Sequence, residues 1–321
     1  MVAGYRLLGL IGAGSMGEVY EAQHKPSNRR VALKLLREKT DDSINAGRRL
    51  IEEARVVTGI RHPGIVVVSD VGLWGDGRPY LVMELLKGLP LSVHLKQKTM
   101  SVADCVTVLE GILDALAAAH RGGVIHRDLK PSNVFVLSGE VPRVKLLDFG
   151  VARREGRTEV LTGPSMAVGS MGFMSPEQLL GNAVASSDLY AVGCIAFFIL
   201  SGRPVFPLKS IPENARSHFS EAPPKLRSLR PEVSAALEAW VDRMLGKHPD
   251  SRPPSAEIAL ASLRALGGTG EEPATHKTEL VAAYVPAGPT QPNHAPQRGP
   301  GETGEQTARS EDERNTTLID S

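Results

Sequence analysis

The segment at residues 126–133, His-Arg-Asp-Leu-Lys-Pro-Ser-Asn, constrains this chain more than any other part of its sequence. Asp128 and Asn133 lie five residues apart, so on one loop they can face the same small volume. The carboxylate can accept a proton from a hydroxyl group, and the amide oxygen can bind a divalent metal ion. Asp148 ends the apolar run 144–147, which predicts a second metal ligand where a strand meets a turn. One base and two oxygen ligands for a hard cation predict a phosphoryl-transfer site.

Three glycines near the N-terminus, Gly12, Gly14 and Gly17, have the spacing GxGxxG. A dinucleotide-binding turn has the same spacing, but there a helix follows the third glycine. Here residues 18–22 and 31–36 both continue as extended segments, which predicts strand, turn and strand. Because glycine has no Cβ atom, its backbone N–H group can approach phosphate oxygens closely. The sequence therefore predicts a glycine flap over the phosphates of a nucleotide.

Lys34 lies inside the second of these extended segments. An isolated lysine at such a place would favour a surface position at a strand edge, but the glycine flap upstream favours a role in phosphate binding. A lysine in a partly desolvated cleft needs an acidic partner to stay charged. Glu53, in the helix-like segment 48–59, is the expected partner. Glu52 would point about 100° away around that helix, so it is expected to face solvent.

Taken together, these motifs resemble those of the eukaryotic-type (Hanks-type) protein kinases, and most closely the bacterial serine/threonine kinases. The resemblance covers about residues 5–266, and Lys130 after the aspartate is the serine/threonine pattern. It implies an α+β, bilobal fold with a small β-rich N-lobe, a hinge and a larger helical C-lobe. These parts are expected at residues 5–83, 84–88 and 89–266. The matching motifs are the glycine motif with Val19 and the segments 31–34, 126–133, 148–150 and 175–177.

The resemblance implies a role for each residue of the phosphoryl-transfer site. Lys34 would hold the α- and β-phosphates of ATP and pair with Glu53. Asp128 would orient and deprotonate the substrate hydroxyl, and Lys130 would neutralise charge on the γ-phosphate. Two Mg²⁺ ions would be bound by Asn133 and Asp148.

The resemblance also implies an adenine site. The ring would lie between Val19 and Ala32 on one side and Phe135 on the other, with Met83 as the gatekeeper. The edge of the ring would bond to backbone groups of the hinge, from Glu84 to Leu86.

Two further residues resemble architectural positions of the family. Asp188 would hold the backbone of the catalytic loop, or would act as an N-terminal helix cap, and both roles can hold at once. Arg252 would pair with Glu177.

Two rival functions belong to other classes. A pseudokinase, an ATP-binding scaffold without catalysis, predicts the loss of Lys34, Asp128, Asn133 or Asp148, and all four are present. A kinase of small molecules would not need the Ser-Pro-Glu segment at residues 175–177, which favours a peptide-binding platform.

Composition excludes several other classes. The formal net charge of +1 at pH 7 implies no strong attraction to nucleic acid or to an anionic membrane. Both cysteines, Cys105 and Cys194, lie in apolar helical contexts, so neither a disulfide framework nor a zinc site is expected. The apolar run 189–200 is too short to span a bilayer and is expected as a buried helix. No signal peptide is evident, so a cytoplasmic location without a membrane span is expected.

The composition changes after residue 266. Residues 267–321 are rich in proline and threonine and lack apolar periodicity, which predicts a disordered tail. In this tail Thr316 and Thr317 precede Ile319 and Asp320 by three residues, a spacing that resembles the phosphothreonine motif read by forkhead-associated domains. Autophosphorylation is expected there and in the activation segment, where a phosphate would bind Arg127. Its expected sites in that segment are Thr158, Thr162 and Ser165.

Overall fold

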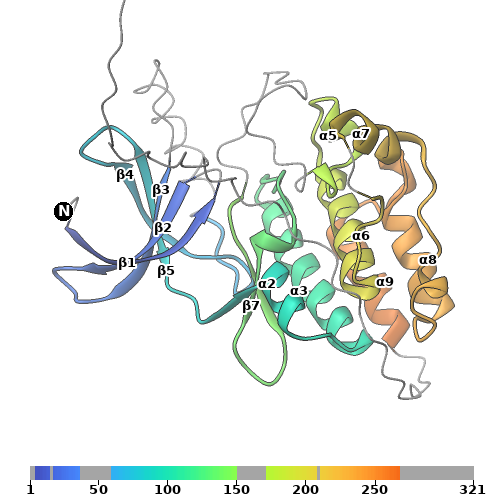
Figure 1. Ribbon diagram of the computed structural model, residues 1–321, viewed down its shortest axis with the longest axis horizontal. Helices are drawn as coiled ribbons and strands as arrows, with labels where there is room; N and C mark the ends of the chain where they lie inside the picture. The colour runs from blue at the N-terminus through green and yellow to red at the C-terminus, as the bar shows by residue number, and fades with distance from the viewer. Residues whose placement is uncertain (1–3, 15–16, 37–58, 150–170, 208–209, 268–321) are drawn as a thin grey trace, which may run out of the picture. The chain divides into compact units, whose positions relative to one another are not determined.

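The computed structural model describes residues 4–14, 17–36, 59–149, 171–207 and 210–267 (Figure 1). Strands dominate the first part of the described chain and helices the second, which confirms the predicted α+β class. The helix expected at residues 48–59, with Glu52 and Glu53, lies almost wholly outside the described residues, as does the tail. Among the helices of the described ranges, none is both long enough and apolar enough to cross a membrane.

The N-terminal part forms a five-stranded antiparallel sheet, drawn in blue to cyan in Figure 1, in the order β1-β2-β3-β5-β4. Its strands are β1 (Tyr5–Gly14), β2 (Gly17–His24), β3 (Arg30–Leu36), β4 (Val68–Leu73) and β5 (Pro79–Glu84). A three-stranded sheet follows in the order β6-β7-β8. Its strands are β6 (Gly88–Pro90), β7 (Val134–Leu137) and β8 (Arg143–Leu146).

The helices belong to the second part of the chain. The α-helices of the described ranges are α2 (Leu91–Gln97), α3 (Val102–Arg121), α5 (Pro176–Leu179), α6 (Ala185–Ser201), α7 (Ile211–Ser220), α8 (Ala235–Met244) and α9 (Ala256–Gly267). Short 3-10 turns are η1 (Pro131–Asn133), η2 (Leu226–Ser228) and η3 (Pro249–Ser251).

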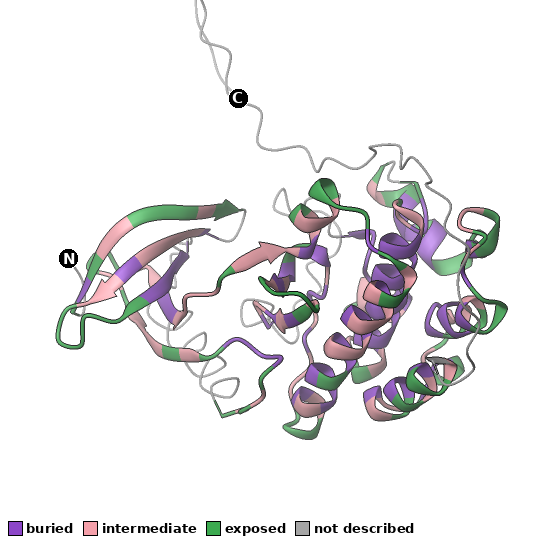
Figure 2. Ribbon diagram, turned by 90° about the horizontal axis from the view of Figure 1, so that it is seen from below, coloured by how far each residue is buried: buried purple, intermediate pink, exposed green. Residues whose placement is uncertain are grey.

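Helix α3 illustrates how local sequence sets these elements. Ser101 precedes it, and its hydroxyl accepts a hydrogen bond from the backbone N–H of Asp104 at 3.0 Å, which caps the helix. The buried residues then recur at spacings of three and four, so one stripe of the helix faces the core (Figure 2). Arg121 at the last turn is favourable beside the partly negative helix C-terminus.

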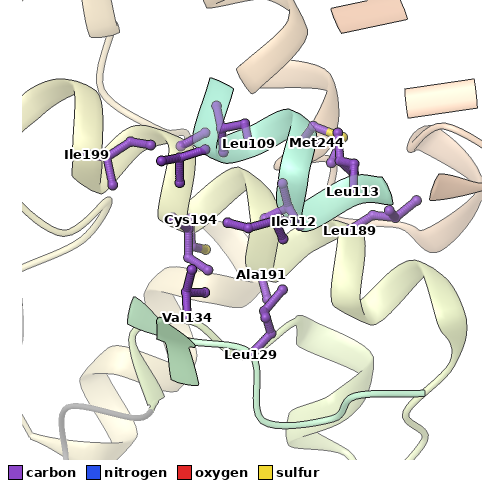
Figure 3. Packing of buried hydrophobic residues seen from close by; sticks show 14 of the residues in the cluster. Leu109, Ile112, Leu113, Leu129, Val134, Leu189, Ala191, Cys194, Ile199 and Met244 are labelled. Atoms are coloured by element: carbon purple, nitrogen blue, oxygen red, sulfur yellow. The ribbon is translucent and has the colours of Figure 1, made fainter. Parts of the chain in front are cut away.

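The core lies between α3, α6 and α8. Helix α6 is buried along almost its whole length, as predicted for residues 189–200, and Leu189 and Cys194 of α6 belong to one cluster with Ile112 of α3 and Met244 of α8 (Figure 3). Gly193 is required at this crossing, because a Cβ atom there would lie 2.9 Å from the Cβ atom of Met244.

Both cysteines are buried, in keeping with their apolar helical contexts. Burial raises the pKa of Cys105 and of Cys194 to about 12, so neither thiol becomes a thiolate near neutral pH. These residues therefore act as small apolar side chains in the core.

A buried polar cluster joins α6 to α7. The Tyr190 hydroxyl and Nδ1 of His218 are 2.9 Å apart, and Lys247 donates to the His218 carbonyl oxygen at 2.9 Å. Burial, with a smaller contribution from the charge of Lys247, lowers the pKa of His218 to about 4. His218 is therefore neutral in the folded protein throughout the mildly acidic range.

Stability should fall in mild acid because of His218. The unfolded chain takes up a proton there below about pH 6.5, whereas the folded protein does so only near pH 4. The stabilisation is therefore complete above pH 6.5 and is lost between pH 6.5 and 4, by about 2 kcal/mol between pH 7 and pH 5. Urea unfolding at these two pH values should show this loss in the wild type, and His218→Gln should lose about 2 kcal/mol less. Equal losses in both proteins would contradict the assignment.

Candidate active site

The expected catalytic loop runs from the end of α3 to η1 and brings together three predicted site residues. The Nζ atom of Lys130 lies 2.8 Å from Oδ2 of Asp128, and Nδ2 of Asn133 donates to the same oxygen at 3.1 Å. Nδ2 of Asn133 also donates to the backbone oxygen of Asp128 at 2.7 Å. The structure thus brings the expected base, the expected γ-phosphate ligand and one expected metal ligand together, with Asp128 and Asn133 both buried.

The backbone of this loop is held by a buried carboxylate on α6. Asp188 accepts hydrogen bonds from the backbone N–H groups of His126 at 2.8 Å and of Arg127 at 3.0 Å. Arg127 has a φ of 63°, a conformation that a residue other than glycine adopts only when its surroundings impose it. The predicted role of Asp188 in holding the loop is confirmed. The alternative role as a helix cap is wrong, because Val184 occupies that position and Asp188 lies one turn further in.

His120 is a third partner of Asp188 that the sequence analysis missed. Its Nε2 atom lies 2.8 Å from Oδ2 of Asp188, and both side chains are almost fully buried. His120 lies in the last turn of α3, shortly before the catalytic loop, so it links the helix, the loop and α6. Its place in the last turn of a helix was the only signal in the sequence, and that signal suggests a favourable charge at a helix end rather than a buried contact.

His126 connects the loop to the segment that carries Asp148. Its Nε2 atom donates to the Leu147 backbone oxygen at 2.9 Å, and its ring lies 4.6 Å from the ring of Phe149. Burial lowers the pKa of His126, so the imidazole is neutral near pH 7. A neutral ring leaves Nδ1 free to accept from the backbone N–H of Asp128, at 3.4 Å.

The glycine motif forms a hairpin, as the flanking segments predict. Gly12 pairs with Val19 and Gly14 with Gly17 across β1 and β2, so no helix follows the third glycine. Gly17 has a φ of 154°, and a Cβ atom there would lie 2.2 Å from the Leu35 backbone oxygen. Only glycine fits at this position, where the first residue of β2 passes close to the backbone of β3.

The strand register puts the expected nucleotide-facing side chains on one face of the sheet. Val19 on β2 lies opposite Lys34 on β3, and Ala32 lies opposite Met83 on β5. Residues two apart along a strand, such as Ala32 and Lys34, share a face. Four of the predicted residues are therefore neighbours on this face. Phe135 comes from β7 of the other sheet, where it pairs with Lys145.

Lys34 is buried and meets Asp148 across the site. The Nζ atom of Lys34 lies 2.7 Å from Oδ1 of Asp148, and Asp148 has a φ of 50°. Glu53, the expected partner of Lys34, lies outside the described residues, so that pairing stays a prediction. Lys34 therefore connects the sheet with the segment after β8 through the expected metal ligand itself.

The oxygen atoms of the expected metal ligands fit a hard cation. The amide nitrogen of Asn133 donates hydrogen bonds to Asp128, so the amide oxygen of Asn133 is the atom that can bind a metal. Asp148 keeps its second carboxylate oxygen beside the one that contacts Lys34. Within the described ranges no three His, Cys, Asp or Glu side chains cluster as a metal site. One carboxylate and one amide suit Mg²⁺, which also takes phosphate and water ligands.

The segment at residues 175–177 is anchored as predicted. Arg252 binds both carboxylate oxygens of Glu177, at 2.7 and 2.9 Å, and Ser187 donates to Glu177 at 2.6 Å. Burial would raise the pKa of Glu177, but the hydrogen bonds from Arg252 and Ser187 outweigh it and lower the pKa to about 2. The next residue, Gln178, donates to the Arg127 backbone oxygen, so this segment also contacts the catalytic loop.

Glu84 contributes more than the backbone groups expected of it. Its carboxylate accepts from the Val67 backbone N–H at 2.8 Å and from Nζ of Lys145 at 2.7 Å. Neither the Glu84 side chain nor Lys145 stands out in the sequence as a site residue.

Comparisons with known proteins agree with this geometry. The model of the protein kinase domain family matches residues 5–262. The serine/threonine-protein kinase Pkn1 of Myxococcus xanthus is 36% identical over 92% of this chain and 43% of its own length. The probable serine/threonine-protein kinase PknB of Lactococcus lactis is 37% identical over 84% of this chain and 43% of its own length. The chain thus spans less than half the length of these two relatives.

A solved structure supports the same assignment. The kinase domain of PknI from Mycobacterium tuberculosis is 28% identical, with a TM-score of 0.66 over 83% of this chain and 97% of that domain. The sequence match, the fold and the arrangement of the site residues agree. The chain therefore belongs to the protein kinase domain family, within its Hanks-type bacterial serine/threonine group.

Proposed function

We propose that this chain transfers the γ-phosphate of ATP to serine and threonine hydroxyls of proteins. The observation that carries the proposal is the convergence of Asp128, Lys130 and Asn133 in one hydrogen-bonded cluster, with Lys34 and Asp148 in contact beside it. Asp128 orients the substrate hydroxyl and accepts its proton, and Lys130 faces the transferred phosphate. Catalysis then comes mainly from positioning and charge stabilisation.

ATP and Mg²⁺ are the proposed cofactors. Asn133 and Asp148 hold the metal through oxygen atoms, and bound Mg²⁺ neutralises negative charge that develops on the phosphates. Lys34 holds the α- and β-phosphates beneath the backbone of Gly12, Gly14 and Gly17. Adenine lies against Val19, Ala32 and Phe135, with Met83 beside it and its edge at the backbone of Glu84 and Leu86. The common face of Val19, Ala32, Lys34 and Met83 supports this arrangement.

Two observations disfavour the rivals. A pseudokinase would not need a buried Asp128 that contacts Lys130 and Asn133. A kinase of small molecules would not need Glu177 fixed on Arg252 next to the catalytic loop, whereas a peptide-binding platform does.

The test is an incubation with labelled ATP and generic protein substrates, with and without Mg²⁺. We expect label on serine and threonine in the protein substrates, and its loss when the metal is chelated. A protein that binds ATP without transferring label would support the scaffold, and label only on small molecules would support the other rival.

The proposal extends to regulation and partners. Arg127 precedes the base and would bind a phosphate on Thr158, Thr162 or Ser165, of which Thr162 is the first choice. These three residues lie outside the described ranges, as do Thr316 and Thr317. Phosphate on Thr316 or Thr317 would dock a forkhead-associated domain, and a pull-down with phosphorylated and unphosphorylated peptides of residues 308–321 tests this. The protein would act in the cytoplasm on protein substrates, without nucleic acid, through a kinase domain at residues 5–266. The disordered tail expected at residues 267–321 lies almost wholly outside the described residues.

A further inference from the structure

Lys145 on β8 forms an ion pair with Glu84, the first residue of the expected hinge. Its Nζ atom donates to Oε1 of Glu84 at 2.7 Å and to the Ile65 backbone oxygen at 3.2 Å. The two side chains are only 13% and 25% exposed, so water screens this pair far less than a surface pair. Lys145 lies 61 residues after Glu84 in the chain, so the contact joins two distant segments.

The same carboxylate is tied to a third segment. Oε1 of Glu84 accepts from the Val67 backbone N–H at 2.8 Å, and the Glu84 N–H donates to the Val67 oxygen at 3.0 Å. Residues 64–66 are in turn bonded to β8, because the Leu146 N–H donates to the Gly64 oxygen at 2.8 Å and the Val66 N–H donates to the Leu146 oxygen at 3.0 Å. The hinge, residues 64–67 and β8 therefore form a closed ring of contacts that includes Lys145.

This ring connects the two ends of the proposed ATP site. Glu84 ends β5 and offers the backbone at which the adenine edge is proposed to bond. Lys145 lies opposite Phe135 in the β7–β8 register, and Phe135 is the proposed floor of the adenine site. Asp148, the proposed metal ligand, lies three residues after Lys145 and two residues past the end of β8. A shift of Lys145 would therefore alter the adenine edge relative to the metal ligand.

We propose that Lys145 is a positioning residue for ATP, which fixes the hinge backbone at Glu84 through the Glu84 carboxylate. This inference rests on the proposed function, since it assigns the hinge to adenine. Without Lys145, the Glu84 carboxylate still accepts the hydrogen bond from the Val67 N–H group. It is then a mostly buried negative charge without the ammonium group of Lys145. Such a carboxylate turns towards water, and the backbone that carries it moves with it. The adenine edge then meets a hinge that is no longer preorganised.

The decisive experiment measures the binding of ADP with Mg²⁺ by calorimetry, without any reaction. Lys145→Met keeps the length and the apolar stem of the side chain but removes its charge, and it should raise the Kd by about tenfold. Lys145→Arg, which can still pair with Glu84, should stay within about threefold of the wild type. Lys225→Met is the matched control, because Lys225 forms an exposed pair with Asp242 at 2.8 Å and should leave the Kd unchanged.

A double-mutant cycle with Glu84→Gln separates positioning from general destabilisation. The glutamine keeps an oxygen for the Val67 N–H but carries no charge, so Lys145→Met should cost much less in that background. In kinetic assays the KM for ATP should rise in Lys145→Met, while the KM for the protein substrate stays the same. A Kd unchanged in Lys145→Met, or equal effects in both backgrounds, would overturn the proposal. A wild-type protein that binds no ADP would instead overturn the proposed function, and this inference with it.

Discussion

Asp128→Asn should reduce kcat by about 10³-fold, within the range of about 10²–10⁴ that a positioned general base contributes. The amide has nearly the shape of the carboxylate, so the loop should keep its hydrogen bond from Asn133 to the backbone oxygen of residue 128. It cannot accept the proton of a substrate hydroxyl at neutral pH. The loss should therefore appear in kcat, measured with saturating ATP and Mg²⁺, and not in the binding of nucleotide.

Two measurements keep this result specific to chemistry. The Kd for ADP with Mg²⁺ should stay within about twofold of the wild-type value, since Asp128 is proposed to face the substrate hydroxyl and not the nucleotide. Asp242→Asn is the matched control, because Asp242 pairs with Lys225 at the surface as Asp128 pairs with Lys130 in the site. Full activity in Asp128→Asn would remove Asp128 from the role of base and leave only positioning for it.

The catalytic loop could be predicted from the sequence because its chemistry is local. Asp128, Lys130 and Asn133 lie within six residues, so a single turn is enough to bring them together, and the structure does so. The glycine hairpin could also be predicted from the sequence, since the extended segments on both sides of Gly17 exclude a helix after it. For the same reason the common face of Ala32 and Lys34 follows from the two-residue period of a strand.

The supports of the site could not be predicted in this way. His120 meets Asp188 across 68 residues, and Lys145 meets Glu84 across 61 residues. The residues next to His120 and Lys145 in the sequence do not show whether these side chains are buried beside an acidic partner or exposed to solvent. Burial is set by the packing of distant elements. The sequence marked Asp188 only through a resemblance, and it left open a helix cap, which the position of α6 excludes.

Backbone conformation was the second kind of information that the sequence lacked. Arg127 and Asp148 both have positive φ values, which are uncommon for residues other than glycine. Each lies where a carboxylate or a histidine from another segment holds the neighbouring backbone, as Asp188 and His126 do. These two conformations orient the proposed catalytic loop and the proposed metal ligand, so the local geometry of the site depends on tertiary contacts.

Lys34→Met should reduce kcat/KM for ATP by about 10²–10³-fold, the usual cost of one electrostatic donor at a phosphoryl or oxyanion site. Lys34 is buried on β3, and its Nζ atom lies 2.7 Å from Oδ1 of Asp148. Methionine matches the length of the lysine stem, so the strand should keep its packing. The phosphates would lose their cation, and the Asp148 carboxylate would lose the partner that orients it.

Lys34→Arg tests whether a positive charge is enough at this position or whether the compact ammonium group of lysine is required. The guanidinium is planar and larger than an ammonium, and a side chain that is 10% exposed leaves little room for it. We therefore expect Lys34→Arg to recover less than about a tenth of the activity lost in Lys34→Met. Lys225→Met should keep full activity, because that lysine is equally ion-paired but exposed. Wild-type kcat/KM in Lys34→Met, with an unchanged melting temperature, would show that the phosphates are held by other groups, and the site assignment built on the Lys34–Asp148 contact would fail.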